Sequence, residues 1–281
     1  MRGSLILALA APLIGAGPAI KAKSIAPGTF VAWTSADGAR SFVHDGVTAT
    51  LRSRWTEGSP TLTVSGRGKA PLRLTVDDST ANFPSNIAIG VLARGQSPSV
   101  LLQSYTGGAH CCWHLIAVMP TGKKFVKVDF GRWDGDMLAW PTDLSGDGVA
   151  DFRFRDQNFL YAFGSYAGSR PPFKIMTIRA LKPVDVSTDP VFRPLYAADL
   201  PKVRTACLEE DNGPDGGACA GYLATAARLG RFDQAWASFL RTDLSKQTGR
   251  IEPCSDSRPN ACVSQLAGDI CAFLRKLRYI K

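Results

Sequence analysis

The sequence predicts a mainly β amino-terminal part, antiparallel and propeller-like or sandwich-like, followed by a small disulfide-stapled helical carboxy-terminal part. Three observations support this fold class. Short runs rich in β-branched and aromatic residues, separated by turn residues, extend from Phe30 to about Ile178. Beyond residue 205, apolar residues recur at helical spacing. Five of the seven cysteines lie in that last third of the chain.

Residues 1–24 have the composition of a cleavable signal peptide. The basic residue Arg2 precedes an apolar stretch, residues 5–20, which prolines and glycines interrupt and which is too short to span a membrane. The small residues Ala22 and Ser24 then offer a cleavage site. We therefore expect a periplasmic or secreted protein without a transmembrane segment.

Residues 25–181 are expected to form the β-rich domain. Turn pairs such as Asp45-Gly46 and Thr121-Gly122 separate the predicted strands. No good helical pattern lies between them, which argues against a doubly wound α/β sheet. The main predicted strands are Thr61–Ser65, Leu72–Val76, Ile87–Leu92, Val100–Ser104, Leu115–Met119, Phe125–Phe130, Asp151–Arg155, Phe159–Phe163 and Phe173–Ile178.

Residues 182–205, rich in proline and aspartate, are expected to be a linker, and residues 206–281 a helical, cysteine-rich region. Helices are predicted over residues 218–229, 232–240 and 261–278, with Gly230 at the position that ends the first of them. Their apolar stripes suit either a separate bundle or packing on the β part, so both arrangements stay open.

A loop rich in oxygen ligands follows the predicted strand Phe125–Phe130 and leads into the predicted strand Asp151–Arg155. Its ligand positions 1, 3, 5, 7 and 9 match the spacing of calcium loops, and Gly146 at position 6 permits a sharp turn. A helical EF-hand is excluded, because position 12 is Phe154 and a strand-like run follows. The predicted calcium ligands are Asp143, Ser145, Asp147, the Val149 carbonyl and Asp151.

The segment DLSGDGVADFRFRD resembles the calcium loop of FG-GAP or VCBS repeats, found in integrin-alpha-type β-propeller blades. The resemblance covers one loop and the strand that follows it, and Ser145 replaces the usual Asn or Asp. It implies a loop between strands whose carboxylates hold calcium. The alternative is an Asp/Gly/Ser turn whose side chains bond their own backbone.

A second unusual segment, residues 107–114, reads GGAHCCWH. His110, Cys112 and His114 alternate along an extended chain, so a transition-metal site is an alternative there. Cys111 and Cys112 have three interpretations: a disulfide with each other, separate disulfides to the helical region, or a reactive thiol beside a histidine. Separate pairing is the expectation, because it leaves the fewest thiols open to oxidation.

Short connections favour two disulfides within the helical region. We expect Cys207 to pair with Cys219 and Cys254 with Cys262, while Cys271 reaches back to Cys111 or Cys112.

Composition and motifs limit the function classes. The formal net charge is +9, or +6 without the leader, but no dense basic tract marks a nucleic-acid surface. No G-x-S-x-G, P-loop or H-E-x-x-H motif occurs in the sequence. We expect an exported, non-enzymatic protein that binds calcium. It would act in recognition or as a structural protein of the cell envelope, with an unknown envelope or extracellular ligand. The alternative is an exported hydrolase or metal-dependent enzyme centred on His110 and His114.

Overall fold

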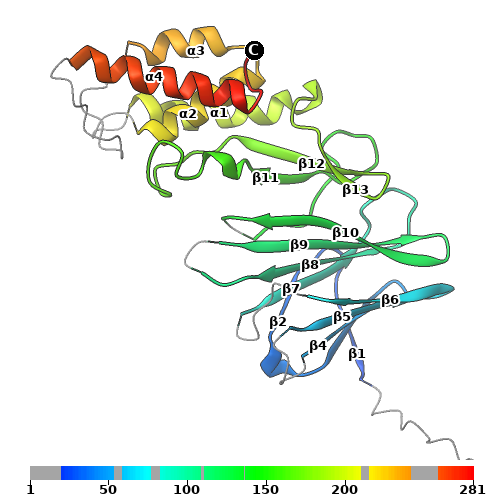
Figure 1. The fold of residues 1–281 in the computed structure, drawn as a ribbon. Coiled ribbons are helices and arrows are strands. Elements are labelled where there is room, and N and C mark those ends of the chain that lie inside the picture. Colours follow the sequence, from blue (N-terminus) through cyan, green and yellow to red (C-terminus); the bar gives the residue numbers. More distant parts are fainter. Residues whose placement is uncertain are drawn as a thin grey trace, which may run out of the picture.

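The computed structural model describes residues 20–53, 59–76, 83–108, 111–135, 137–209, 215–241 and 259–281. A β part is followed along the chain by a helical part that contains a disulfide, which confirms the predicted fold class (Figure 1). The strands are β1 (Ala22–Ser24), β2 (Val31–Trp33), β3 (Arg40–His44), β4 (Val47–Arg52), β5 (Thr61–Gly66), β6 (Lys69–Thr75), β7 (Ser85–Gly90), β8 (Ser99–Tyr105), β9 (Trp113–Thr121), β10 (Lys124–Trp133), β11 (Phe152–Arg155), β12 (Phe173–Arg179) and β13 (Lys182–Asp185). The helices are α1 (Arg193–Leu208), α2 (Gly216–Arg228), α3 (Phe232–Phe239) and α4 (Pro259–Lys276), with 3-10 turns η1 (Ser35–Asp37), η2 (Gln157–Phe159) and η3 (Pro190–Phe192).

The first ten strands form one curled sheet in the order β1-β3-β4-β5-β6-β10-β9-β8-β7-β2. Neighbours are antiparallel except for the pairs β1–β3 and β6–β10, which are parallel. The sheet bends so that its two arms share one core on the concave side, where Leu51 and Leu62 of one arm cluster with Leu102 and Ile116 of the other. Side chains alternate between the two faces of a strand, so this core uses every second residue.

The convex face of β8, β9 and β10 packs on a second sheet of three strands, ordered β11-β12-β13. Leu101, Leu115 and Val128 of the large sheet contact Phe152 and Phe154 of β11 in one cluster. The alternation of Phe and Arg in β11 places both phenylalanines on this buried side and both arginines on the other. The large sheet therefore has a core on each face: one between its own two arms and one against the small sheet.

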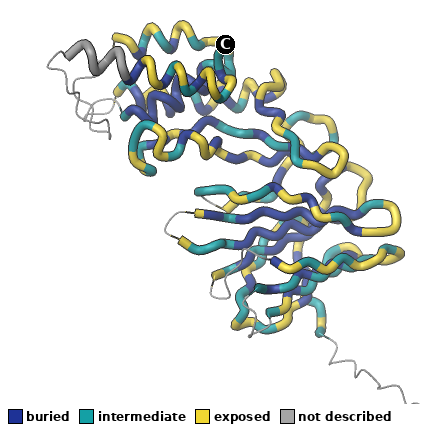
Figure 2. The backbone as a smooth tube through the Cα atoms, viewed as in Figure 1, coloured by how far each residue is buried: buried dark blue, intermediate teal, exposed yellow. Residues whose placement is uncertain are grey.

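The helices cover the other side of the small sheet. Ile175 of β12 packs with Phe192 and Tyr196 at the start of α1. A further core unites α2, α3 and α4 with Phe159 of η2. Figure 2 shows long buried stretches in the middle strands of the large sheet and in α2, whose residues from Gly216 to Ala226 are all buried. Sheet, sheet and helices thus stack along the long direction of the molecule (Figure 1).

The structure corrects two predicted segments, the linker and one strand. The predicted linker, residues 182–205, contains β13, η3 and most of α1. The predicted strand Phe159–Phe163 begins instead with the end of η2, and Phe159 belongs to the helical core. Residues 1–19 of the predicted leader lie outside the described residues, whereas Ala22–Ser24 form β1 and pair with β3.

Candidate functional site

A cleft of about 890 Å³ opens where the large sheet, the small sheet and α1 meet. Its walls come from the ends of β9 and β10, from β11, from α1, and from two connecting segments, residues 134–142 and 160–171. The residues that characterise it are Trp113, Trp133, Trp140, Arg153, Tyr166 and Lys202. Aromatic rings and basic groups thus line the cleft together with the carboxylates of Asp134, Asp151 and Asp199.

Close packing fixes the aromatic wall. The ring of Trp133 stacks on Phe154 of β11, with 3.8 Å between centroids and 11° between planes. Trp140 covers two glycines: a Cβ on Gly28 would lie 2.8 Å from its ring, and one on Gly90 would also lie 2.8 Å away. Gly28 also has a positive φ of 67°, a conformation that L side chains rarely adopt. These contacts hold both tryptophans in place before any ligand arrives.

Gln103 of β8 anchors the segment that forms one side of the cleft. Its amide donates to the Leu138 carbonyl at 2.7 Å and accepts from the Leu138 N–H at 2.8 Å. Gln103 is 1% exposed. The two hydrogen bonds therefore satisfy both polar ends of its buried side chain and both backbone groups of Leu138. Further along, Thr142 pairs with Asp151 just ahead of β11.

An ion pair between an exposed arginine and a buried aspartate ties the small sheet to α1. Arg155 of β11 bonds both carboxylate oxygens of Asp199, at 2.6 and 3.2 Å, and stacks 3.7 Å from the centroid of Phe173. Asp199 is 7% exposed and is neutralised by this pairing. Arg153 and Lys202 are exposed and show no ion pair within the described residues. The cleft therefore presents unpaired positive charge.

The calcium-type loop forms part of the same wall, through Leu144 and Asp151. Asp143 accepts hydrogen bonds from the N–H groups of Gly146 (2.7 Å) and Gly148 (2.9 Å), and Asp147 from that of Val149 (2.8 Å). Asp151 accepts from the N–H groups of Leu144 and Ser145, both at 2.9 Å. The predicted ligands thus lie in one loop, and their carboxylates bind its amides.

Two further properties bear on a cation in this loop. Burial raises the pKa of Asp151, and the nearby charge of Asp147 raises it further, although hydrogen bonds from Ser145 and Leu144 oppose the shift. Within the described residues, no group of three or more His, Cys, Asp or Glu side chains is arranged to hold a metal ion. The loop holds hard oxygen donors, but the structure does not gather them around one point.

Of the two histidines in residues 107–114, the described one, His114, points away from the cleft. His114 shares the concave face of β9 with Ile116, whereas its neighbours Trp113 and Leu115 line the cleft. Its Nε2 lies 2.8 Å from Oδ1 of Asp129 on β10. His110 lies outside the described residues.

Asp129 is held ionised by its neighbours. Partial burial would raise its pKa, but hydrogen bonds from Lys127, His114 and the Gly131 N–H outweigh burial and lower it to about 2. The Lys127 ammonium lies 2.7 Å from the carboxylate. Neither Lys127 nor Asp129 lines the cleft.

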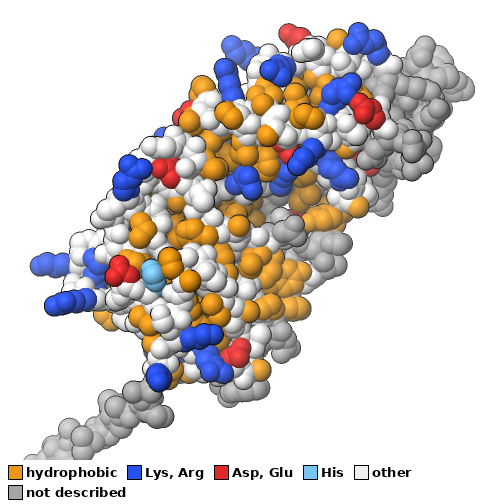
Figure 3. Space-filling model, turned by 180° about the vertical axis from the view of Figure 1, so that it is seen from behind, with side chains coloured by type: hydrophobic (Ala, Val, Ile, Leu, Met, Phe, Trp, Pro, Cys, Tyr) orange, Lys and Arg blue, Asp and Glu red, His pale blue; other side chains and the backbone are white. Residues whose placement is uncertain are grey.

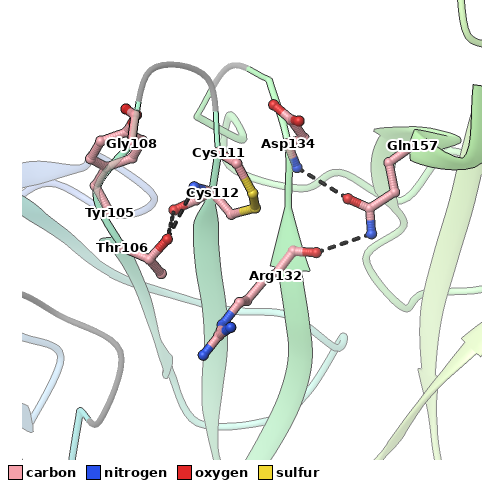
Figure 4. Close-up of a disulfide and its surroundings, with 8 residues drawn as sticks. All are labelled: Tyr105, Thr106, Gly108, Cys111, Cys112, Arg132, Asp134 and Gln157. Atoms are coloured by element: carbon pink, nitrogen blue, oxygen red, sulfur yellow. Dashed lines mark hydrogen bonds between the residues drawn. A yellow bond between two sulfur atoms is a disulfide. The ribbon is translucent and has the colours of Figure 1, made fainter. Parts of the chain in front are cut away.

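The cysteines follow a pattern different from the one expected. Cys111 and Cys112 form a disulfide with each other, so the prediction of separate disulfides is wrong (Figure 4). Local hydrogen bonds fix the position of this pair: the Cys112 N–H donates to the Thr106 hydroxyl (3.1 Å), and the Cys112 carbonyl accepts from the Thr106 N–H (2.9 Å). Beside them, Gln157 bridges the Arg132 carbonyl and the Asp134 N–H of the neighbouring segment (Figure 4).

In the helical region the predicted Cys207–Cys219 disulfide is confirmed. Cys271 has no disulfide partner within the described part of the chain, so the prediction that it reaches Cys111 or Cys112 is wrong. The predicted partners Cys254 and Cys262 lie outside the residues whose side chains are described.

Sequence reasoning missed most of the cleft. Gln103, Trp140 and Lys202 come from three distant segments, and no local pattern marks them. The one available signal was the alternation of Phe and Arg in residues 152–155, which places two arginines on the same side of a strand. That pattern indicates a strand with a basic face and a buried apolar face.

Comparison with known proteins gives a family. None of the described helices is long and apolar enough to cross a membrane. Residues 196–279 match the family "sll0997 C-terminal domain". The chain is 32% identical over 239 residues to the "Probable thylakoid lumen protein sll0997" of Synechocystis sp., a match that covers 79% of this chain and 68% of that protein. No solved structure matches the chain. The chain therefore belongs to the family of the Synechocystis protein sll0997.

Proposed function

We propose that the protein is an exported, non-catalytic recognition protein that binds its ligand in the cleft between the two sheets and α1. The observation that carries the proposal is the cleft itself, whose volume of about 890 Å³ lies in the range of ligand sites. Its walls are set in advance by the Trp133–Phe154 stack and the Gln103–Leu138 hydrogen bonds. Preorganised walls lower the entropic cost of binding.

Three observations support export to the periplasm, to the outside or to an equivalent lumen. The amino-terminal residues have the composition of a signal peptide. The Synechocystis relative is described as a thylakoid lumen protein. A disulfide such as Cys207–Cys219 also persists best in an oxidising compartment.

The cleft favours a ligand with negative charge and flat or apolar groups. Tryptophan and tyrosine rings supply apolar faces, and Arg153 and Lys202 supply charge that no described acidic side chain neutralises. Figure 3 shows Lys and Arg side chains spread along one face of the molecule, with hydrophobic side chains between them.

Anilinonaphthalene sulfonate (ANS), an aromatic anion, is a suitable probe for this proposal. We expect the folded protein to enhance ANS fluorescence, and Lys202→Glu to weaken the binding roughly fivefold, the effect of losing about 1 kcal/mol. Lys123→Glu, in the exposed turn between β9 and β10, makes the same change of charge elsewhere and should leave the affinity unchanged. Equal loss in both variants, or no binding at all, would contradict the proposal.

We propose further that the loop from Asp143 to Asp151 takes up calcium and thereby stiffens the cleft wall. The loop supplies oxygen donors only, which suits a hard cation. Burial, and after it the charge of Asp147, raises the pKa of Asp151, and a bound cation would offset both effects. Binding requires these carboxylates to give up some hydrogen bonds to the loop amides, so we expect a weak site.

Calorimetric titration of the metal-stripped protein with calcium tests this. Heat of binding and an increase in Tm at millimolar calcium are expected, and Asp147→Asn should abolish both. Asp45→Asn is the matched control, because Asp45 is an exposed turn residue with a φ of 43° that Asn also tolerates. Neither heat nor stabilisation in the unaltered protein would show that the loop is an ordinary Asp/Gly turn.

The enzymatic alternative has less support. His114 faces the concave core and pairs with Asp129, on the opposite side of β9 from the cleft. A catalytic role would need a substrate to approach that face, and His114 does not line the cleft.

A further inference from the structure

We propose that the outer edge of β11, inside the cleft, binds an extended acidic peptide as a fourth strand of the small sheet. The inference rests on the proposed function, in that it names the ligand of the same cleft. It depends on three features of the described residues: the hydrogen-bonding direction of β11, the path of residues 138–142, and the charges at the mouth of the cleft.

The register of the small sheet shows which backbone groups of β11 are used. In an antiparallel pair, alternate residues bond to the partner strand and the residues between them point the other way. The Asp156 N–H donates to the Pro172 carbonyl at 2.9 Å. The backbone N–H and carbonyl groups of Phe154 and Phe152, two and four residues earlier, therefore also point towards β12. The N–H and carbonyl groups of Arg153 and Arg155 therefore point to the outer edge.

The chain itself begins to cover this edge and then leaves it. The Asp151 N–H donates to the Thr142 carbonyl at 2.8 Å. This bond shows that the backbone groups of the odd-numbered residues from 151 to 155 point to the outer edge. Continued in the same register, Trp140 would pair with Arg153. Instead the segment turns away, because Gln103 holds both backbone groups of Leu138.

The cleft lies where the two segments separate, and Trp140, Arg153 and Arg155 line it. No main-chain partner within the described residues bonds Arg153 or Arg155 on this side. Their backbone groups recur every ~6.6–6.8 Å, two residues along a strand, a spacing that another extended main chain matches. An open strand edge of this kind is a template for strand addition.

The side chains of the cleft predict an alternating peptide. Residues that pair with Arg153 and Arg155 would share the face on which those arginines and Lys202 lie, where acidic side chains find opposite charge. The residue between them would lie on the side of Phe154 and Trp133, where an apolar side chain fits. Arg155 already pairs with Asp199, so Arg153 and Lys202 supply most of the attraction.

The predicted pattern is acidic-apolar-acidic, and the probe is the labelled, end-capped peptide Glu-Val-Glu-Val-Glu. Fluorescence anisotropy with the full chain measures its affinity, and Lys-Val-Lys-Val-Lys is the charge control. Two N-methylated versions test strand pairing directly. Methylation on one set of alternate residues removes the N–H groups that would face β11, whereas methylation on the other set does not.

We expect the acidic peptide to bind and the basic one to bind at least tenfold more weakly. The version methylated on the N–H groups that face β11 should lose at least tenfold in affinity, because two hydrogen bonds are removed and each corresponds to roughly a fivefold change. The other version should keep the affinity of the parent within about threefold.

Variants of β11 give a second, independent readout. Arg153→Ala removes the charge and keeps the outward N–H, and should weaken peptide binding roughly fivefold. Arg153→Pro removes the N–H as well, at an edge position where a strand tolerates proline, and should weaken binding further. Circular dichroism checks that both variants fold; if Arg153→Pro does not, the two N-methylated peptides decide.

The outcomes separate this inference from the proposed function. ANS binding together with equal affinities for the parent and both N-methylated peptides would overturn strand addition and leave the cleft as a ligand site. Tighter binding of the basic peptide would overturn the assigned charge. Absence of both ANS and peptide binding would overturn both proposals, whereas peptide binding that displaces ANS and depends on one methylation pattern supports both.

Discussion

A single hydrogen bond joins the end of the chain to the β part, and its removal tests how firmly the helical layer is attached. The Tyr279 hydroxyl donates to Oδ2 of Asp156 at 2.9 Å, next to η2. Asp156 is 5% exposed and Tyr279 9% exposed, so water does not readily replace either partner. Burial, followed by the charge of Asp156, raises the pKa of Tyr279, so the hydroxyl remains a donor at neutral pH.

Tyr279→Phe deletes the hydroxyl and keeps the ring, which packs edge-on against Phe159 at 5.3 Å and lies under Arg228 at 4.0 Å. A hydrogen bond to a charged group contributes about 1.5–3 kcal/mol, and loss of the donor leaves a buried carboxylate oxygen without it. We therefore expect the free energy of unfolding to fall by roughly 2 kcal/mol, or the Tm by about 4–8 °C for a protein of this size.

Chemical denaturation followed by tryptophan fluorescence and by far-UV circular dichroism measures the change. Tyr161→Phe is the control, because Tyr161 is 57% exposed and loses the same hydroxyl at little cost. If the helices attach to the sheets as one cooperative unit, both signals should shift together in Tyr279→Phe. A change below about 0.5 kcal/mol, or equal effects of the two substitutions, would refute the reasoning from burial and charge.

Three further predictions follow from single contacts. The pKa of Asp129 in the folded protein is about 2, below its ordinary value of about 3.9. Its contribution to the free energy of unfolding is therefore present above pH ~4 and disappears as the pH falls towards 2. Asp129→Asn should therefore destabilise the protein by about 1 kcal/mol at pH 7, after allowance for solvent screening, and by nothing measurable near pH 2 in urea titrations. Replacement of Cys207 and Cys219 by alanine should cost about 2–3 kcal/mol, the loop-closure entropy of a short connection, and a Tm unchanged by reduction of the wild-type protein would contradict this. Gly28→Ala should cost more than about 1 kcal/mol in thermal unfolding and alter the fluorescence of the protein, because its Cβ would meet the Trp140 ring at 2.8 Å; a neutral substitution would show that Trp140 moves freely.

Local patterns predicted the regular elements well where one physical signal dominated. Alternating or continuous apolar runs bounded by turns marked β5, β7, β8, β9, β10 and β12. The Ala-rich period followed by Gly230 marked α2, and Gly230 has the left-handed φ of 71° that such an ending requires. These signals act over a few residues, so no tertiary information was needed.

The errors occurred where distant contacts outweighed local preference. The prolines Pro194 and Pro201 favour a linker where the structure has α1. Pro194 is in the first turn, where no hydrogen bond is lost, and burial of Tyr196 and Val203 against other layers compensates for Pro201 inside the helix. The aromatic run from Phe159 to Phe163 suited a strand, but Phe159 packs against α4 and no neighbouring strand is available to it.

The sequence by itself determined the succession of β and helical parts, one of the disulfides, and a loop of oxygen donors, because each depends on spacing along the chain. Only the tertiary structure decided that Cys111 pairs with Cys112, that His114 faces away from the cleft, and that β11 keeps an open edge there. The cleft combines β9, β10, β11 and α1 with two connecting segments, and whether their side chains meet depends on how the sheet curls and how the layers stack. Pairing and packing between residues far apart in the chain leave no local signature, which is why the site became visible only in the folded protein.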